Sequence, residues 1–362
     1  MNTKFHKPNH LPISGCSLDF NKFSEELENA QFALGLLEGS QKKLHNPSLL
    51  ISPLTAKEAT VSSKIEGTIS TVSDVLLFDA GGEAKHSDTK QVSNYRMAMT
   101  YAIKQLKDSR PLTPHLIKTL HGILLKDVRC KGPLGKFRND AVWIGEKPTD
   151  PIEKAIYVPP EHHMIQDYVD NLFDYINDGG GSVLIKTGIA HYQFEAIHPF
   201  GDGNGRIGRL LIPLILYQKA KLSQPILYIS GYLEKHRDEY REKLHEVDQT
   251  GKFENWLAFY FRAISSQLEE TQALIDKIYA LYDEIKAQSD TTKSPYMIPF
   301  IDFIFEKPFF TIPTAQKNIK ASARNTIVSL IKSFEENGFV QELSSKQGRA
   351  KFYEFKPLVD LL

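Results

Sequence analysis

HPFGDGNGRIGR, residues 198–209, interrupts a long apolar stretch of the chain. Before it, Ala190, Phe194 and Ile197 recur at helical spacing, and the apolar run LLIPLIL follows it. Apolar residues at i, i+4 and i+7 predict one buried face of a helix. The sequence therefore predicts a polar, glycine-rich turn between two core helices, the second of which begins near Gly203 to Gly205.

The predicted turn has the features of a phosphate-binding site. The first backbone N–H groups of a helix have no partner within the helix, and the helix dipole favours an anion beside them. Arg206 and Arg209 lie about one turn apart on the second helix, and guanidinium groups match the geometry of phosphate oxygens. Glycines allow an anion to approach the backbone closely. We therefore expect a polyphosphate to bind here.

Two further side chains of the turn are suited to chemistry on that phosphate. Asp202 can hold a divalent cation, because Mg²⁺ is commonly bound by one carboxylate together with substrate phosphates. His198 lies four residues before Asp202, at the end of the first helix, and is a candidate general base.

Other nucleotide and metal sites fit the sequence less well. GNGRIG, residues 203–208, matches GxGxxG, but a dinucleotide fold needs a preceding strand and an acidic residue about 20 positions later. The preceding segment predicts a helix, and no Asp or Glu occurs from 210 to 233. The Gly-Lys-Ser/Thr of a P-loop is absent. HExxH is also absent, and the His162-His163 pair has no partner at metal-ligand spacing, so a zinc enzyme is not supported.

The composition predicts an ordinary soluble protein. The 362 residues include 44 Lys+Arg and 44 Asp+Glu, so the net charge of zero gives no sign of nucleic-acid or membrane binding. The two cysteines, Cys16 and Cys130, form neither a disulfide framework nor a CxxC site. No apolar run approaches 18 residues, and the N-terminus lacks the apolar region of a signal peptide. We expect a cytoplasmic protein with no membrane partner.

Helical patterns dominate the chain. An extended arm is expected over the first 20 residues, and helices over about 54–66, over 93–106, and after Thr113-Pro114. Short β-branched and aromatic runs within 137–163 predict a β-hairpin. After it, helical patterns continue to about residue 288, apart from a glycine break at 179–181. The predicted domains are a helical region at 1–108, a core at 109–288 and a C-terminal domain at 295–362.

HPFGDGNGRIGR resembles the motif HPFx[DE]GNGRxxR of the Fic (filamentation induced by cAMP) family, with every fixed position present. The resemblance extends to AHYQFEAI, to GKFRNDAVWIG and to YLEKHRDEYREKL. It implies a mostly α fold, a Fic-type helical bundle with a short β-hairpin flap. After this bundle, the sequence predicts a C-terminal segment of three helices and two strands, QELSS and AKFYEF. This order of elements is typical of a winged helix-turn-helix domain.

The resemblance also implies an activity, protein adenylyltransferase. Such enzymes move AMP from ATP onto a Tyr, Ser or Thr hydroxyl of a protein and release pyrophosphate. His198 would deprotonate the hydroxyl, Asp202 would hold Mg²⁺, and the arginines would neutralise the β- and γ-phosphates. The residues expected to bind ATP are Asp202, Gly203, Asn204, Gly205, Arg206, Ile207, Gly208 and Arg209.

Two further groups of site residues follow from the resemblance. The flap would dock the target by β-augmentation, through Lys154, Ala155, Ile156 and Tyr157. The adenosine would be held by Tyr240, Leu244 and Asp248, although their helical spacing fits ordinary packing equally well.

SSKIEG, residues 62–67, resembles the inhibitory motif [ST]xxxE[GN] of Fic proteins, with Ser62, Glu66 and Gly67 in register. Glu66 would pair with Arg209, so that this arginine no longer clamps the γ-phosphate. The alternative to an inhibitory motif is a surface helix without a regulatory role that ends at a glycine. A second alternative is that Glu66 activates water, so that the same site removes AMP.

Other functions stay open at this point. On the same fold the reaction could be AMP removal or phosphotransfer, although the intact GNGR argues against phosphotransfer. A different class is a nucleotide-sensing regulator that binds DNA through the winged helix. Residues 291–362 carry ten Lys/Arg and seven Asp/Glu, a modest excess that favours protein contact over DNA. Relatives in the family often dimerise, so a homodimer is compatible with the resemblance.

Overall fold

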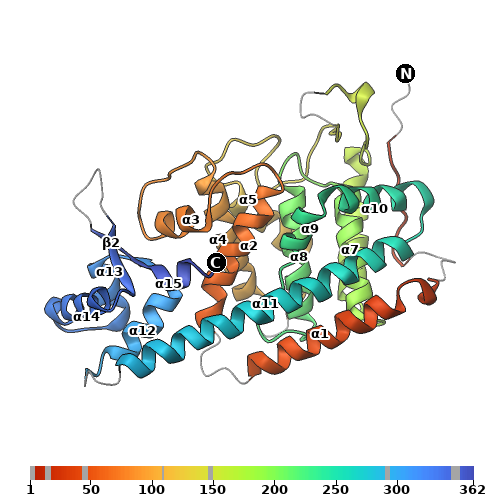
Figure 1. Cartoon of the computed structure of the whole chain (residues 1–362). Helices are drawn as coiled ribbons and strands as arrows, with labels where there is room; N and C mark the ends of the chain where they lie inside the picture. Colours follow the sequence, from red (N-terminus) through yellow and green to blue (C-terminus); the bar gives the residue numbers. More distant parts are fainter. Residues whose placement is uncertain are drawn as a thin grey trace. The chain divides into compact units, whose positions relative to one another are not determined.

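Helices form most of the chain, and the only sheet of the described residues lies near the C-terminus (Figure 1). The computed structural model describes residues 5–12, 18–42, 48–107, 110–145, 150–289, 294–343 and 351–362. Two compact units divide the chain: Met1–Lys42 with Asn94–Leu268, and Lys43–Ser93 with Glu269–Leu362. These boundaries differ from the three consecutive segments expected, because helices α4 (Thr89–Gln105) and α11 (Glu254–Ser289) each run through both units.

The first unit is built around two helices that lie side by side, α7 (Val183–Ile197) and α8 (Asn204–Gln218) (Figure 1). Nearly every side chain of both helices is buried, as the apolar runs around residues 198–209 predict. The other helices of this unit, besides parts of α4 and α11, are α1 (Ser24–Lys42), α5 (Pro114–Leu124), α6 (Ile165–Asn177), α9 (Ser230–Lys235) and α10 (Arg237–Thr250).

Local sequence explains where these helices begin. Thr113 caps α5 by accepting a hydrogen bond from the N–H of Leu116, and Pro114 occupies the first turn, where its missing N–H costs nothing. α7 begins after Ser182, beyond the glycines at 179–181. The predicted turn between α7 and α8 is confirmed, because α7 ends at Ile197 and α8 begins at Asn204.

The N-terminal arm, described over residues 5–12, contains no helix or strand and is tied to the first unit by side-chain amides. Asn171 accepts from the N–H of Leu11 and donates to its carbonyl, both at 2.8 Å. Gln193 donates to the carbonyl of Asn9 at 2.8 Å. Nearer the terminus, the N–H of His6 donates to the carbonyl of Val158 at 2.8 Å.

The second unit combines two helices from the N-terminal half with the C-terminal segment. They are α2 (Ser48–Lys64) and α3 (Val72–Asp79), joined by α12 (Met297–Glu306), α13 (Ile312–Ile319), α14 (Arg324–Glu336) and α15 (Lys356–Val359). The strands β1 (Phe309–Phe310), β2 (Val340–Leu343) and β3 (Phe352–Phe355) form an antiparallel sheet in the order β1-β3-β2. The sequence between the two longer strands predicts a turn at Lys346 to Gly348, which lies outside the described residues.

Helix α2 packs against α12 within this unit. Ala56 of α2, Leu76 of α3 and Phe309 of β1 share one buried cluster, and Phe309 is 5% exposed. The two N-terminal helices and the C-terminal sheet are therefore held by a common apolar core.

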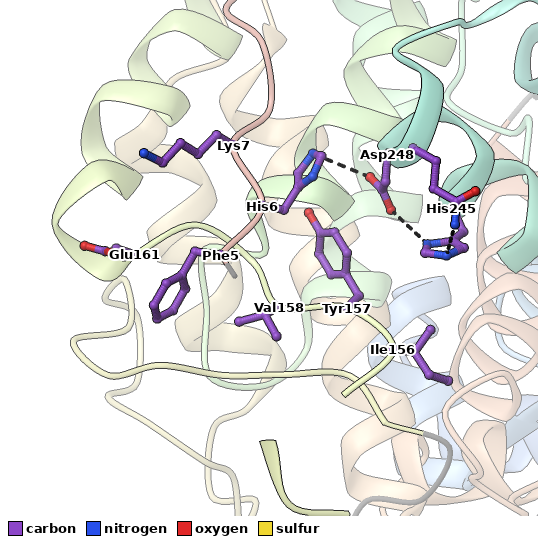
Figure 2. A pocket seen from close by; sticks show the side chains of 10 residues that line it. Phe5, His6, Lys7, Ile156, Tyr157, Val158, Glu161, His245 and Asp248 are labelled. Carbon is purple, nitrogen blue, oxygen red and sulfur yellow. Dashed lines mark hydrogen bonds and ion pairs between the residues drawn. The ribbon is translucent and has the colours of Figure 1, made fainter. Parts of the chain in front are cut away.

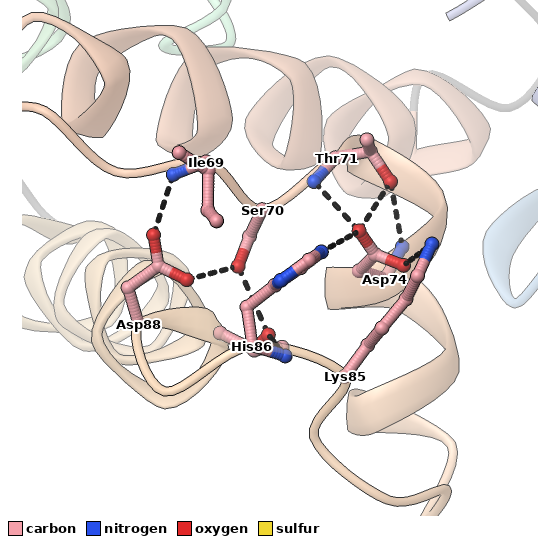
Figure 3. A network of polar contacts seen from close by, with 8 residues as sticks. Ile69, Ser70, Thr71, Asp74, Lys85, His86 and Asp88 are labelled. Atoms are coloured by element: carbon pink, nitrogen blue, oxygen red, sulfur yellow. Dashed lines mark hydrogen bonds and ion pairs between the residues drawn. The ribbon is translucent and has the colours of Figure 1, made fainter.

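A polar network fixes the chain between α2 and α4 (Figure 3). The carboxylate of Asp88 accepts from the N–H of Ile69 at 2.6 Å and from the hydroxyl of Ser70 at 2.6 Å. Thr71 and Asp74 form a capping box at the start of α3, and the ammonium group of Lys85 lies 3.3 Å from Asp74. Residues 69–89 are thereby closed into a defined loop around α3.

Several predicted elements differ from those observed. The hairpin is reduced to one bridge, Ile144↔Tyr157, in the described parts of 137–163, with short 3₁₀ helices at Ile152–Lys154 and His162–Met164. Helix α2 begins six residues earlier than expected and includes Pro53, while α3 was not predicted. Residues 219–229 contain no helix, although a helical pattern was expected to continue there.

Candidate active site

The turn between α7 and α8 begins with a left-handed residue. His198 has φ 49° and ψ 59°, and its N–H closes α7 by donating to the carbonyl of Phe194 at 3.0 Å. A non-glycine residue in this region costs about 1–3 kcal/mol, and such strain is concentrated at functional sites. The backbone therefore turns sharply at the candidate base.

The hydrogen bond of the His198 ring defines its neutral tautomer. Nδ1 lies 3.3 Å from the carbonyl oxygen of Glu195, which can only accept. Nδ1 therefore carries the proton of the neutral ring, and Nε2 carries the lone pair. In this tautomer Nε2, on the side of the ring away from Glu195, can accept a proton, as a general base must.

The N–H groups at the start of α8 lie at the turn. Gly203, at φ 77°, is the N-cap, and the first intrahelical bond runs from the N–H of Ile207 to the carbonyl of Gly203 at 3.1 Å. The N–H groups of Asn204, Gly205 and Arg206 therefore precede the helical ladder. An anion in the turn would meet these N–H groups and the positive end of the helix dipole.

The charged residues of the motif lie close together. Nη2 of Arg206 is 3.3 Å from Oδ1 of Asp202, which lies four positions earlier, in the turn before α8. Arg206 and Arg209 are buried, while the Asp202 side chain is 37% exposed. Asp202 can thus reach a ligand from solvent, while the arginines are held within the protein.

Three residues of the motif serve packing. Ile207 is fully buried, so its side chain faces the core. A Cβ on Gly208 would lie 2.5 Å from Oε1 of Glu195, so this glycine leaves room for the Glu195 side chain beside α8. The side-chain amide of Asn204 exchanges two hydrogen bonds of 2.8 Å with the backbone of Phe200, which shapes the turn.

Arg138 supports the turn from outside the motif, and its role was not predicted. The buried guanidinium donates to the carbonyls of His198 at 2.9 Å, Asp140 at 2.9 Å and Pro160 at 2.6 Å. Burial lowers the pKa of Arg138 to about 10, so it stays charged at neutral pH. One cation therefore joins the candidate base to the segments on either side of the predicted flap.

Only some of the predicted flap and adenosine residues line a common cavity. A cavity of about 940 Å³ lies between the N-terminal arm, the flap and α10, and its lining includes Ile156, Tyr157 and Asp248 (Figure 2). The hydroxyl of Tyr157 donates to the carbonyl of Ala196 at 2.6 Å, close to His198. The cavity is not lined by Lys154 and Ala155, which lie at the end of the 3₁₀ helix, or by Leu244.

Tyr240 is buried in the core instead. Its hydroxyl lies 2.9 Å from Nε2 of His191, whose Nδ1 lies 3.1 Å from the carbonyl of Gly208. Burial lowers the pKa of His191 to about 4, so the ring is neutral at neutral pH. Nδ1 must then donate to the carbonyl, and Nε2 accepts from Tyr240.

The predicted inhibitory residues lie in the second unit, at the end of α2. Ser62 belongs to the last turn of the helix, which ends at Lys64, so Glu66 is not helical as the predicted helix 54–66 had it. The N–H groups of Glu66 and Gly67 donate to the carbonyls of Ser63 and Lys64, both at 2.9 Å. Gly67 has φ 93°, a conformation that favours glycine and explains why the helix ends here.

Within the described ranges no group of three or more His, Cys, Asp or Glu side chains could hold a metal ion by itself. No helix in the same ranges has the length and apolar character needed to cross a membrane. Asp202 is one partly exposed carboxylate beside a helix N-terminus, and such a group fits Mg²⁺ that arrives together with nucleotide phosphates.

The fold and the site define a helical protein with a glycine-rich, charged turn between two core helices. Family models described as "Fic/DOC family N-terminal" and "Fic/DOC family" match residues 24–104 and 111–216, which together exceed half of the chain. The chain belongs to the Fic/DOC family.

Individual relatives match over shorter stretches. A probable protein adenylyltransferase of Aquifex aeolicus is 29% identical over 118 residues, which is 32% of this chain and 32% of that protein. The protein adenylyltransferase Fic of Drosophila mojavensis is 31% identical over 137 residues, which is 36% of this chain and 25% of that protein. The matches therefore cover no more than about a third of these relatives.

Two solved structures share the fold. A Fic family protein from Desulfovibrio desulfuricans G20 has a TM-score of 0.58 at 18% identity, and the match covers 91% of this chain and 96% of that one. Fic-1 of Caenorhabditis elegans has a TM-score of 0.55 at 17% identity, with 70% of this chain and 74% of that chain covered.

Proposed function

We propose that this protein transfers AMP from ATP to a Tyr, Ser or Thr hydroxyl of a protein. The observation that carries the proposal is the turn between α7 and α8, where a base-competent His198 precedes a helix N-terminus that carries Arg206 and Arg209. The names of the Aquifex and Drosophila relatives, both protein adenylyltransferases, support the same reaction.

The proposed reaction is a displacement at the α-phosphate. The target oxygen attacks phosphorus, its proton passes to Nε2 of His198, and the bond from the α-phosphorus to the bridging oxygen breaks to release pyrophosphate. The N–H groups of Asn204, Gly205 and Arg206 would stabilise the charge that develops on the phosphoryl oxygens. Arg206 and Arg209 would neutralise the leaving pyrophosphate.

Magnesium fits the proposal through Asp202. The bound ion would supply charge neutralisation between the phosphates, as in other phosphoryl transfers. Asp202 would orient it, because Arg206 holds one oxygen of the carboxylate at 3.3 Å and the side chain remains 37% exposed.

The flap would receive the target. Ile144 and Ile156 are 42% and 52% exposed. Ile144 pairs with Tyr157 in the bridge that joins the two sides of the flap, and Ile156 precedes Tyr157. Exposed apolar side chains beside a backbone bridge suit an extended segment of a partner protein. Asp248 is the adenosine candidate that lines the adjacent cavity.

Inhibition by Glu66 is part of the proposal. It is supported by the match of SSKIEG to the inhibitory motif and by the tight turn at Gly67 that follows α2. Glu66 would compete with the γ-phosphate for Arg209, and ATP would then bind with a misaligned α-phosphate. The C-terminal helices and sheet would act as a winged helix that contacts protein.

The test uses ATP labelled at the α-phosphate and, separately, at the γ-phosphate. Wild type, Glu66→Gly and Glu66→Gly/His198→Ala are incubated with Mg²⁺ and cell lysate, and protein-bound label is counted. We expect label from the α-phosphate alone, about tenfold more with Glu66→Gly because one charge-assisted hydrogen bond is restored to the phosphate. Loss of His198 should lower incorporation by about 10²–10⁴-fold.

Glu83→Gly is the matched control, because Glu83 is an exposed glutamate of the loop after α3. It should behave as wild type. Label from the γ-phosphate would refute adenylyl transfer in favour of phosphotransfer. An unchanged signal in Glu66→Gly would refute the inhibitory role alone. Loss of pre-formed AMP from a labelled protein would point to AMP removal.

A further inference from the structure

His121 is a buried polar residue outside the Fic motif that touches the catalytic turn. It lies on α5 among apolar side chains and is 1% exposed. A histidine on a buried helix face is costly unless both ring nitrogens find partners. Both of its partners are backbone groups of two different loops.

The two hydrogen bonds of His121 fix its tautomer. The N–H of Gly135 donates to Nδ1 at 3.0 Å, so Nδ1 carries no proton. Nε2 therefore carries the proton and donates it to the carbonyl of Asp202 at 3.1 Å. The ring accepts at Nδ1 and donates at Nε2. Only one orientation of the neutral ring can therefore bond both the N–H of Gly135 and the carbonyl of Asp202.

The ring is also fixed by stacking. His121 lies parallel to Phe200, with 4.0 Å between ring centroids and an interplanar angle of 3°. Phe200 exchanges two hydrogen bonds with Asn204, the first residue of α8. The ring of His121 therefore contacts the turn at both Phe200 and Asp202.

The loop on the other side of the ring is closely fitted to the turn. A Cβ on Gly201 would lie 2.6 Å from the carbonyl oxygen of Lys131, and one on Gly135 would lie 3.3 Å from the carbonyl of Lys118. Gly135 has φ 68°, so its N–H is presented to His121 by a conformation that favours glycine.

We propose that His121 is a positioning residue that sets the direction of the Asp202 carboxylate. By holding the Asp202 carbonyl, the ring fixes the peptide from which that carboxylate projects toward Arg206 and the proposed phosphate site. The inference rests on the proposed function, because it assigns His121 to the binding of a Mg²⁺-nucleotide at this turn.

Two substitutions separate the two hydrogen bonds. In His121→Gln the side-chain amide nitrogen takes the place of Nε2 and can still donate to Asp202. In His121→Asn the shorter side chain replaces only Nδ1 and can still accept from Gly135. Both variants lose the stacked ring, and they differ from each other by one methylene group, whose effect on folding the unfolding measurement reports.

The measurements are calorimetric affinity for Mg²⁺-ATP, urea unfolding, and the ¹⁵N signals of the His121 ring. We expect binding about tenfold weaker in His121→Asn, which corresponds to about 1.4 kcal/mol, and within about threefold of wild type in His121→Gln. The ring signals should show an unprotonated Nδ1 and a protonated Nε2.

Equal affinities in the two variants, or a protonated Nδ1, would overturn the assignment. If both variants unfold more easily yet bind as wild type, His121 only stabilises the fold. Failure of the proposed function is a separate outcome, in which wild type binds Mg²⁺-ATP but transfers no label. The comparison of Gln with Asn still decides the role of His121 in that case.

Discussion

Burial sets the protonation of the side chains around α7. It lowers the pKa of His191 to about 4 and raises the pKa of Tyr157 well above its usual range, so both are neutral at neutral pH. Each hydrogen-bonds a backbone carbonyl near the turn, that of Gly208 or that of Ala196. Neutral buried donors therefore position the motif without adding charge to the proposed phosphate site.

Asp248 is a partly buried acidic residue whose protonation should affect the stability of the fold. Burial raises its pKa to about 6, although it accepts from the Tyr192 hydroxyl at 2.8 Å. His6 and His245 lie on either side of its carboxylate, with nitrogens 3.7 Å from its oxygens (Figure 2). The folded protein therefore holds this proton more tightly than the unfolded chain does.

The stability that Asp248 contributes should fall as the pH rises through 6. It is fully present below pH 4, and about 1.4 kcal/mol should be lost between pH 5 and pH 7.5. Urea unfolding of wild type and Asp248→Asn at these two pH values measures the effect. In Asp248→Asn the unfolding free energy should not show this loss between the two pH values. Asp174→Asn, at an exposed position on α6, should show the same loss as wild type. Parallel declines in wild type and Asp248→Asn would show that the pKa of Asp248 is not raised.

At the scale of elements, close backbone contact fixes the turn between α7 and α8. Gly201→Ala places a Cβ 2.6 Å from the backbone oxygen of Lys131, so either the turn or the loop must move. We expect a loss of about 1–3 kcal/mol in unfolding free energy and weaker Mg²⁺-ATP binding, both measured on one preparation. Gly179→Ala is the control, because its Cβ would meet no atom within 4 Å. Equal behaviour of the two variants would mean that the turn adapts freely.

The sequence predicted the elements that carry strong periodic patterns. The turn between α7 and α8 was found because apolar residues on both sides follow a helical period. The hairpin was overpredicted, since Trp143, Ile144 and Ile156 resemble strand residues but are exposed beside a single bridge. A local pattern of β-branched and aromatic residues does not reveal how many backbone pairs will form.

The supporting residues of the site were harder to predict. Arg138 and His121 act through backbone carbonyls of segments far away in sequence, and no spacing rule reports such contacts. One signal was present for His121, because it falls on the apolar face of α5, where a polar residue needs a partner. Identifying that partner required the fold.

At the scale of the whole molecule, the predicted inhibitory segment shares a unit with the C-terminal helices and sheet. Glu66 follows α2, which packs against α12, and Ala56 of α2 contributes to the same buried cluster as Phe309 of β1. The position of Glu66 therefore depends on residues more than 200 positions later in the chain. Three consecutive domains would not produce this dependence.

Phe309→Ala should consequently release the proposed inhibition. The substitution removes a large buried side chain, costs about 3–5 kcal/mol, and loosens the cluster that holds α2. Incorporation of label from the α-phosphate should rise in Phe309→Ala and should not rise further in Phe309→Ala/Glu66→Gly. Ile331→Ala, a buried change on α14 outside the cluster, controls for general loss of stability. Additive effects of Phe309→Ala and Glu66→Gly, or an equal rise with Ile331→Ala, would show that the cluster does not act through Glu66.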